Sequence, residues 1–307
     1  MSWIVMLAVT QAPNVRLALT NLPENVSLVR EVLAGLAGVV PLEDGQLDDV
    51  KTVVSEACNN VVLHAYDGAL GPLDVEIRVA DGTLEVTVRD CGGGLRPRLG
   101  RKGEMEGIGI PVIHALTDRV EFSGGIGEGT EVRMHFDVPE ARELGLAGVD
   151  GRAHDGAGDG RGRGDRQGRA ATDSDPVVVV PVNGATATLD VAPLSLARSV
   201  LSRPLTALAA RARFSIDRLS DVQLVTDAIA AHAGRSLHGS RLQVVVATAT
   251  RDLELRVGPL LPGAATQLIG DTAVGGLEPL IETLADEVTV ESLGDCDVLT
   301  LRLLDPR

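Results

Sequence analysis

A helical pattern runs through the stretch Val54-Ser55-Glu56-Ala57-Cys58-Asn59-Asn60-Val61-Val62-Leu63-His64-Ala65-Tyr66. Counted from Val50, apolar residues recur at i, i+3, i+4, i+7 and i+11, which predicts an amphipathic helix over residues 44–66. Glu56, Asn60 and His64 are spaced four apart, so they share a second face of this helix. Consecutive asparagines are poor helix formers because their amides compete with the backbone for hydrogen bonds. This face is either an ordinary solvated surface or a functional surface.

The size and charge of the chain limit its class. With 307 residues it is long enough for two domains of ordinary size. Hydrophobic residues make up 44% and aromatic residues only 2%, so the cores must be aliphatic. The formal net charge of −15 argues against a nucleic-acid surface, because phosphate binding needs a basic face, and it favours a basic protein partner. We therefore expect no direct contact with nucleic acid.

The cysteines and the apolar segments indicate the cellular compartment of the protein. Cys58, Cys91 and Cys296 have no metal-ligand spacing, and their odd number argues against a disulfide scaffold. Residues 1–9 are apolar but short, and they lack a charged leader and a cleavage pattern. No stretch is long enough to span a bilayer. We expect a cytoplasmic protein without membrane contact.

Turn residues divide the first 140 residues into alternating strands and helices. Asp81-Gly82, between two alternating segments, is a strong hairpin signal. Pro111 suits the first turn of a helix. The predicted strands are 15–19, 73–79, 84–88, 120–122 and 131–136, and the predicted helices are 23–38, 44–66 and 107–118.

A second copy of this pattern follows a linker. Residues 146–175 are rich in Gly, Asp and Arg and nearly free of aliphatic residues, which predicts a flexible linker. Beyond it, strands are predicted at 186–191, 242–247 and 253–257, helices at 193–212, 217–237 and 277–284, and two strands at the end. Pro111, Ile113, Leu116, Asp118 and Val120 recur as Pro279, Ile281, Leu284, Asp286 and Val288. This indicates an internal duplication, with a domain at 1–140, a linker at 141–175 and a degenerate domain at 176–307.

Three glycine-bearing segments near the central helix suggest a nucleotide site. Asp90-Cys91-Gly92-Gly93-Gly94 ends a strand, where Asp90 can accept a hydrogen bond from an exocyclic amine and glycines allow close ligand approach. Gly107 and Gly109 precede a helix N-terminus, whose free N–H groups favour phosphate. Each segment alone is usually only a turn, but the ordered set is far more specific.

Side chains on the helix could supply the chemistry. Asn60 offers an amide oxygen to Mg²⁺, which prefers oxygen ligands and bridges phosphates. Glu56, one turn away, could accept a proton from an attacking hydroxyl. A basic loop lies where a lid would close over a triphosphate, and it contains Arg96, Arg98, Arg101 and Lys102.

This set of motifs resembles the GHKL (Bergerat-fold) ATPases. Glu56-x-x-x-Asn60 looks like their N box, Asp90-x-Gly92-x-Gly94 like their G1 box, and Gly107-x-Gly109 like their G2 box. Gly129-Thr130 is similar to their final nucleotide-contacting turn. The branch it resembles most is the bacterial anti-sigma factors of the RsbW and SpoIIAB type, which are serine protein kinases. The resemblance covers about residues 13–138.

The resemblance implies a fold, a site and partners. It implies an α+β, two-layer α/β sandwich in which helices cover one face of a mixed, mostly antiparallel sheet, here duplicated. It implies Glu56 as the general base, Asn60 on Mg²⁺ and Asp90 on the adenine of ATP. The further nucleotide-binding candidates are Asn59, His64, Gly92, Gly94, Lys102, Gly107, Gly109 and Thr130. The implied partners are a sigma factor and a small STAS-domain anti-anti-sigma factor, which the kinase phosphorylates.

The second copy departs from these motifs. In the sequence, Asp227 stands where Glu56 does, but Ala231 replaces Asn60, Val257 replaces Asp90 and Leu277 replaces Gly109. We therefore expect this copy not to bind ATP. Members of the branch are usually single-domain dimers, so the extra copy predicts either an intramolecular pseudo-dimer or a homodimer.

Three functions remain open at this point. The first is an ATP-dependent serine/threonine kinase and anti-sigma factor. The second is a non-catalytic protein that uses nucleotide to set its affinity for a partner. The third is the catalytic module of a histidine-kinase-like signalling protein, which is disfavoured because no helical segment with a phosphoacceptor histidine precedes the domain. The intact Glu56 favours the first over the second.

Overall fold

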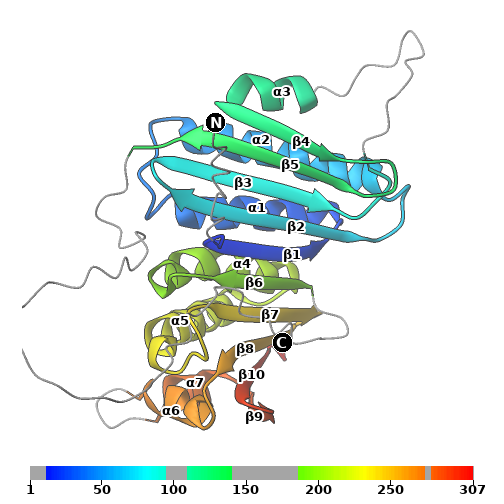
Figure 1. Ribbon diagram of the computed structural model, residues 1–307. Coiled ribbons are helices and arrows are strands. Elements are labelled where there is room, and N and C mark those ends of the chain that lie inside the picture. Colours follow the sequence, from blue (N-terminus) through cyan, green and yellow to red (C-terminus); the bar gives the residue numbers. More distant parts are fainter. Residues whose placement is uncertain (1–11, 95–108, 140–185, 274–277, 307) are drawn as a thin grey trace, which may run out of the picture.

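A single ten-stranded sheet runs through both halves of the molecule (Figure 1). The computed structural model describes residues 12–94, 109–139, 186–273 and 278–306. The strand order is β4-β5-β3-β2-β1-β6-β7-β8-β10-β9, and every described pairing is antiparallel, where a mixed sheet was expected. Helices α1, α2, α4 and α5 lie on one face of the sheet. The predicted α+β, two-layer class is confirmed.

The first half contains the elements predicted for it. Pro23 occupies the first turn of α1, where its missing N–H is not needed. The helix predicted over 44–66 divides at Asn60, where its geometry changes. The elements are β1 (Val15–Thr20), α1 (Pro23–Leu36), α2 (Gln46–Asn60), the π-helix η1 (Val61–Ala65), β2 (Pro72–Ala80), β3 (Thr83–Asp90), α3 (Gly109–Leu116), β4 (Arg119–Gly124) and β5 (Thr130–Asp137).

The second half repeats the order of the strands and of the main helices. The segment after β8, predicted as a loop, contains the short helix α6. The elements are β6 (Ala187–Val191), η2 (Leu194–Leu196), α4 (Ala197–Arg211), α5 (Ile216–His232), η3 (Ala233–Arg235), β7 (Leu242–Ala249), β8 (Asp252–Leu260), α6 (Ala264–Gly270), α7 (Leu280–Leu284), β9 (Glu287–Leu293) and β10 (Cys296–Leu304). Within the described ranges, no helix is long and apolar enough to cross a membrane.

The two halves are joined edge to edge within the chain. Strand β1 pairs with β6 from Val15 opposite Val191 to Leu19 opposite Ala187, and both halves contribute to one aliphatic core. Helices α1 and α4 pack closely, because a Cβ on Gly35 would overlap the carbonyl of Ser199. The guanidinium of Arg211 on α4 donates to the carbonyl of Glu24 (2.8 Å) and to Asn25 Oδ1 (3.1 Å) on α1. Desolvation by burial lowers the pKa of Arg211.

Matching contacts support the predicted duplication. The Asp118 side chain accepts a hydrogen bond from the N–H of Asp137 (2.8 Å), and that of Asp286 accepts one from Leu304 (2.7 Å). The N–H groups of the same two aspartates donate to the carbonyls of His135 and Arg302. Each half therefore attaches its penultimate strand to its last strand in the same way.

The buried positions also fix which residues correspond. In α2 the buried residues are Val50, Val53, Val54, Ala57 and Cys58, and in α5 they are Val222, Val225, Thr226, Ile229 and Ala230, each 172 positions later. In this register Ala228 matches Glu56 and His232 matches Asn60, which corrects the alignment with Asp227 and Ala231. Val75 pairs with Val88, as Val244 pairs with Val257, so Pro259 and not Val257 matches Asp90.

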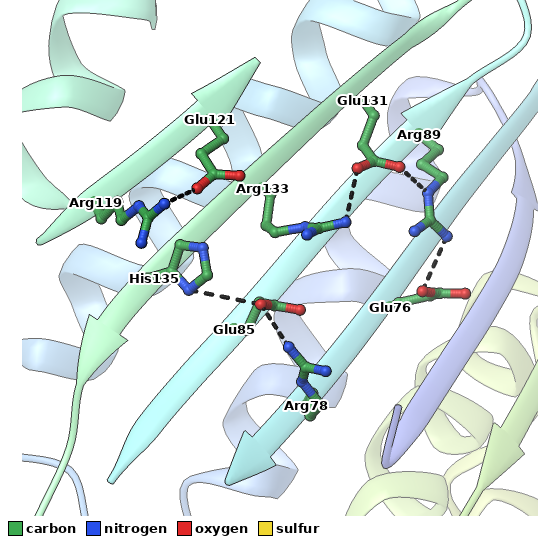
Figure 2. Close-up of polar contacts among 9 residues, drawn as sticks. All are labelled: Glu76, Arg78, Glu85, Arg89, Arg119, Glu121, Glu131, Arg133 and His135. Carbon is green, nitrogen blue, oxygen red and sulfur yellow. Dashed lines mark hydrogen bonds and ion pairs between the residues drawn. The ribbon is translucent and has the colours of Figure 1, made fainter. Parts of the chain in front are cut away.

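Charged residues line the sheet face that turns away from the helices (Figure 2). One chain of ion pairs crosses β2, β3 and β5, linking Glu76 to Arg89 (2.9 Å), Arg89 to Glu131 (2.5 Å) and Glu131 to Arg133 (2.9 Å). Partly exposed pairs of this kind contribute little stability each. They do explain why this face needs no helix layer.

The predicted linker, 141–175, lies outside the described residues. The boundaries at 140 and 176 therefore remain predictions.

Candidate functional site

The end of α2 holds the loop that follows β3. After Asn60 the helix widens into the π-helical turn η1, a feature frequent at functional sites. The N–H of Gly93 donates to the carbonyl of Ala65 (2.8 Å), and the carbonyl of Gly93 accepts from the N–H of Gly127 (3.0 Å). The loop from Asp90 to Gly94 is thus fixed between the π-helical turn and the β4–β5 turn.

The glycines of this loop are required by contacts within the protein. A Cβ on Gly92 would overlap the carbonyl of Ala65, and a Cβ on Gly94 would overlap the carbonyl of Gly125. Gly94 and Gly129 also have positive φ (+71° and +77°), which side chains other than glycine rarely adopt. The expectation that these glycines make room for a ligand is therefore incomplete, since a side chain would first strike the backbone.

Asp90 is held in a position to bind a hydrogen-bond donor. It is buried at the end of β3, and its Oδ1 accepts from the N–H of Gly92 (2.8 Å). In the described part of the chain, no hydrogen bond reaches its Oδ2. Thr130 lies directly opposite on β5. The structure places Asp90, Gly92, Gly94 and Thr130 next to one another, and an oriented carboxylate with one open oxygen fits an exocyclic amine.

The polar face of α2 points away from the core. Glu56, Asn59 and Asn60 are half-buried and His64 is exposed. Within the residues described here, none of these four side chains has a hydrogen bond or an ion pair. Among the described residues, a ligand at this face would therefore displace no protein partner of these side chains. The described residues contain no cluster of three metal-ligating side chains. A cation at Asn60 would therefore take most of its ligands from phosphate and water, as Mg²⁺ commonly does.

Comparison with known proteins places this arrangement in a family. Residues 19–136 match the histidine kinase-like ATPase domain. An anti-sigma F factor of Caldanaerobacter subterraneus subsp. tengcongensis is 31% identical over 120 residues, which cover 84% of that protein and 36% of this chain. The chain belongs to the anti-sigma factor family of histidine kinase-like ATPases.

Other relatives agree with this assignment. An anti-sigma F factor of Geobacillus stearothermophilus is 30% identical over 131 residues, covering 90% of that protein and 39% of this chain. Among solved structures, the blue-light activated histidine kinase of Erythrobacter litoralis EL346 is 25% identical over 32% of each chain, with a TM-score of 0.28, which is too low to carry an argument. The stretches that match these two relatives are 120 and 131 residues long, and the family model matches residues 19–136, which lie in the first half of the chain.

Tyr66 is a part of this ATPase site that sequence reasoning did not assign. Its hydroxyl accepts from the N–H of Cys91 (2.9 Å) and donates to the carbonyl of Pro72. Burial raises the pKa of Tyr66, so the hydroxyl stays protonated and can donate. Tyr66 is the one tyrosine in the chain, and it lies two residues after His64. This position could have indicated from the sequence that Tyr66 belongs to the site.

Cys58 faces the core rather than the site. It is fully buried on α2, and burial raises the pKa of its thiol to about 12. The thiol is therefore protonated at neutral pH and acts as a small apolar side chain. This agrees with the absence of metal-ligand spacing among the cysteines.

Some predicted site residues lie beyond the described ranges. Lys102, Gly107 and the basic loop 96–102 lie outside the described residues, and their roles stay predictions. Gly109 is the first residue of α3, which packs against α2.

The second half has apolar residues at and after the position that matches Asp90. Its strand β8 continues through Pro259 to Leu260, which bridges to Leu237, and the N–H of His238 donates to the carbonyl of Pro259 (2.9 Å). Helix α6 follows directly and buries Ala264, Ala265, Leu268 and Ile269. At the position that matches Asp90 the second half has Pro259, which cannot supply a carboxylate.

Proposed function

We propose that this protein is an ATP-dependent serine/threonine kinase and anti-sigma factor with one nucleotide site, located in its first half. The observation that carries the proposal is the oriented Asp90 carboxylate beside a helix whose polar face has no partner among the described residues. Family membership supports ATP as the nucleotide.

Each residue of the site has a different role in this proposal. Asp90 holds the adenine amine through Oδ2, while the Gly92 N–H fixes its other oxygen. Asn60 would hold Mg²⁺, which would supply positive charge beside the transferring phosphoryl group. Glu56 accepts the proton of the attacking serine or threonine hydroxyl. Asn59, His64, Lys102, Gly107, Gly109 and Thr130 complete the nucleotide contacts.

The protein partners follow from the relatives' names and from the resemblance. Both relatives described above are named anti-sigma F factors, so we assign this chain a sigma factor as its regulated partner. The phosphoryl acceptor is a small STAS-domain antagonist, whose phosphorylation would end its competition with the sigma factor. Both partners and the kinase are assigned to the cytoplasm.

A non-catalytic role is the second candidate. It is favoured by the open half-buried face of α2, which suits ligand binding whether or not phosphoryl transfer follows. In that case nucleotide would alter partner affinity without being consumed. A histidine-kinase-like module is the third candidate, and it would transfer phosphate to a histidine rather than to a hydroxyl amino acid.

One experiment separates the three candidates. Purified full-length protein is incubated with γ-labelled ATP, Mg²⁺ and STAS-domain proteins encoded by the same genome. The proposal expects acid-stable label on a serine or threonine of one of them, lost with Glu56→Gln. Binding of ATP without any transfer would support the non-catalytic role, and acid-labile label on a histidine would support the third.

A further inference from the structure

The Asp90 loop and the junction of the two halves lie at the same end of the sheet. Strand pairing places Asp90 opposite Leu73 and Leu73 opposite Leu19, so β3, β2 and β1 end together. Leu19 pairs on its other side with Ala187 of β6. Only β2 and β1 therefore separate the nucleotide-binding loop from the second half (Figure 1).

Asn21, which follows β1, holds the segment after Tyr66. It is buried, its Oδ1 accepts from the N–H of Gly71 (2.8 Å), and its Nδ2 donates to the carbonyl of Ala69 (3.0 Å). A Cβ on Gly71 would overlap the ring of Tyr66, so the Gly71 backbone and the ring are in close contact. The hydroxyl of Tyr66 accepts from the N–H of Cys91 (2.9 Å). Asn21 thus supports the loop after β3 through Tyr66.

Asn25 and Arg211 extend this network into the second half. Asn25, in the first turn of α1, is fully buried, and its Nδ2 donates to the carbonyl (3.0 Å) and the hydroxyl (3.1 Å) of Thr20, the residue before Asn21. Its Oδ1 accepts from the guanidinium of Arg211 on α4 (3.1 Å), which also donates to the carbonyl of Glu24 (2.8 Å). The contacts therefore run from α4 to the loop after β3.

The second half has the same local fold without the two asparagines. Buried residues of α1 recur in α4 172 positions later, as in Leu28 and Val200, Leu33 and Leu205, and Leu36 and Leu208. In this register Pro193 matches Asn21, and the fully buried Ala197 matches Asn25. The fold of a half therefore does not require asparagine at these positions, and the asparagines occur in the half that has the candidate site.

We propose that the second half holds the nucleotide-binding loop in place through this network, with Arg211, Asn25 and Asn21 as positioning residues. This rests on the proposed nucleotide site and gives the second half a role in it. The three residues lie outside the elements that carry the candidate site residues, so they act through Tyr66 and the loop. A loop that is fixed before ATP arrives loses less conformational freedom on binding, which favours affinity.

The test measures ATP binding by full-length variants with calorimetry. Asn21→Ala removes both side-chain hydrogen bonds to the segment after Tyr66, and Asn14→Ala is the matched control. Asn14 lies at the other end of β1, where it accepts from the N–H of Val79 (2.6 Å) and donates to the carbonyl of Ala192 (3.3 Å). Both variants lose the same kinds of hydrogen bond. We expect Asn21→Ala to raise Kd for ATP about 3- to 10-fold and Asn14→Ala to leave it within about twofold.

A second pair of variants tests the contribution of the second half. Arg211→Met removes the guanidinium that contacts Asn25, and Arg203→Met removes another α4 arginine, which pairs with Glu31 of α1 (3.6 Å). Both arginines are exposed, so both variants should fold. We expect Arg211→Met alone to raise Kd for ATP about 2- to 5-fold. Combined with Asn21→Ala it should add little, because both changes act through the same contacts.

The ionisation of Tyr66 provides a readout that does not involve nucleotide. Absorbance at alkaline pH follows this residue alone, since the chain has one tyrosine. Burial raises the pKa of Tyr66, and release of the segment in Asn21→Ala should expose the hydroxyl and lower the pKa toward that of a free tyrosine. Asn14→Ala should leave it unchanged.

The outcomes separate this inference from the proposed function. An unchanged Kd for ATP in Asn21→Ala, or an equal rise in Asn14→Ala, would overturn the inference, because the contacts would then serve folding alone. If Asn21→Ala does not fold, the arginine pair decides, and equal Kd values in Arg211→Met and Arg203→Met would overturn it. The expected shifts in a chain that transfers no phosphate to any STAS-domain protein would support the inference and contradict the kinase. No ATP binding by the unaltered chain would overturn both.

Discussion

The two halves of this molecule share a fold and differ in their chemistry. Strands β1 to β5 and β6 to β10 follow the same spatial order outward from the β1–β6 junction. The buried stripes of α2 and α5 match position by position, with valine, isoleucine or alanine at most positions. The polar positions do not match, since Glu56, Asn60 and Asp90 correspond to Ala228, His232 and Pro259. The fold therefore depends on its buried positions, and the site is an addition that one half lacks.

The two halves also differ at the ends of their third strands, β3 and β8. The first half leaves a carboxylate oxygen and a polar helix face without protein partners in the described residues. In the second half the strand that matches β3 is followed by α6, whose buried residues stabilise that half directly. A ligand site requires groups that the protein does not satisfy itself, and the predictions below test this contrast and the contact between the halves.

The largest effect is expected for Glu56→Gln, which keeps the shape of the side chain and removes the base. Phosphoryl transfer should fall by about 10²- to 10⁴-fold, the usual contribution of a general base. ATP affinity should be retained, as measured by calorimetry.

Asp227→Asn is the matched control for this change. Asp227 is the acidic residue beside the matched position on α5, where it pairs with Arg198 (2.9 Å). Transfer should be unaffected. Equal losses in the two variants would show that the halves do not differ in the way proposed.

Asp90→Ala should weaken nucleotide binding by the whole chain. Loss of a hydrogen bond to a charged acceptor weakens binding by about 1.5–3 kcal/mol, or roughly 10- to 100-fold in Kd. The unaltered protein should bind about one ATP per chain, because the second half has no equivalent carboxylate. Calorimetric titration of both proteins checks this, and a second equivalent of bound ATP would contradict the single-site assignment.

Gly35→Ala should loosen the contact between the halves. The added Cβ would overlap the Ser199 carbonyl, and overpacking of this kind costs about 1–3 kcal/mol of unfolding free energy. Gly270→Ala is the control, because a Cβ there meets no atom within 4 Å. Urea unfolding curves of the two variants should differ in midpoint. An unchanged midpoint in Gly35→Ala would mean that α1 and α4 do not pack as described.

The smallest effect is expected for Tyr66→Phe. Removing the hydroxyl leaves the Cys91 N–H without its acceptor, which should cost about 1 kcal/mol of stability and weaken ATP binding a few-fold. Denaturant unfolding and nucleotide titration of the same variant check the two effects together.

The ionisation of Tyr66 provides an independent check. Because it is the one tyrosine, its phenol can be followed by absorbance at alkaline pH. Its pKa is raised in the folded state, so its contribution to stability should be complete below about pH 10 and decline as the pH rises further. Ionisation at or below the pH of a free tyrosine would contradict the buried hydrogen-bonded position.

Much of the fold could be predicted from the sequence because it depends on local patterns. The alternation of Val15, Leu17 and Leu19 predicted β1, and the stripe from Val50 to Val61 predicted α2. Helix α6 was missed because its seven residues are too few for a periodic signal. The counterparts of Glu56 and Asp90 were displaced by one and two positions, because sequence alone does not show which residues are buried or paired.

The sequence by itself determined the elements, the repeated pattern and the residue types of a nucleotide site. These follow from the spacing of apolar residues and from motifs whose members are close in the chain. Only the tertiary structure decided that β1 and β6 join the halves, that Tyr66 and the π-helical turn hold the Asp90 loop, and that the helix α6 follows β8. These contacts connect residues far apart in the chain, where geometry and close packing, rather than local propensity, select the arrangement.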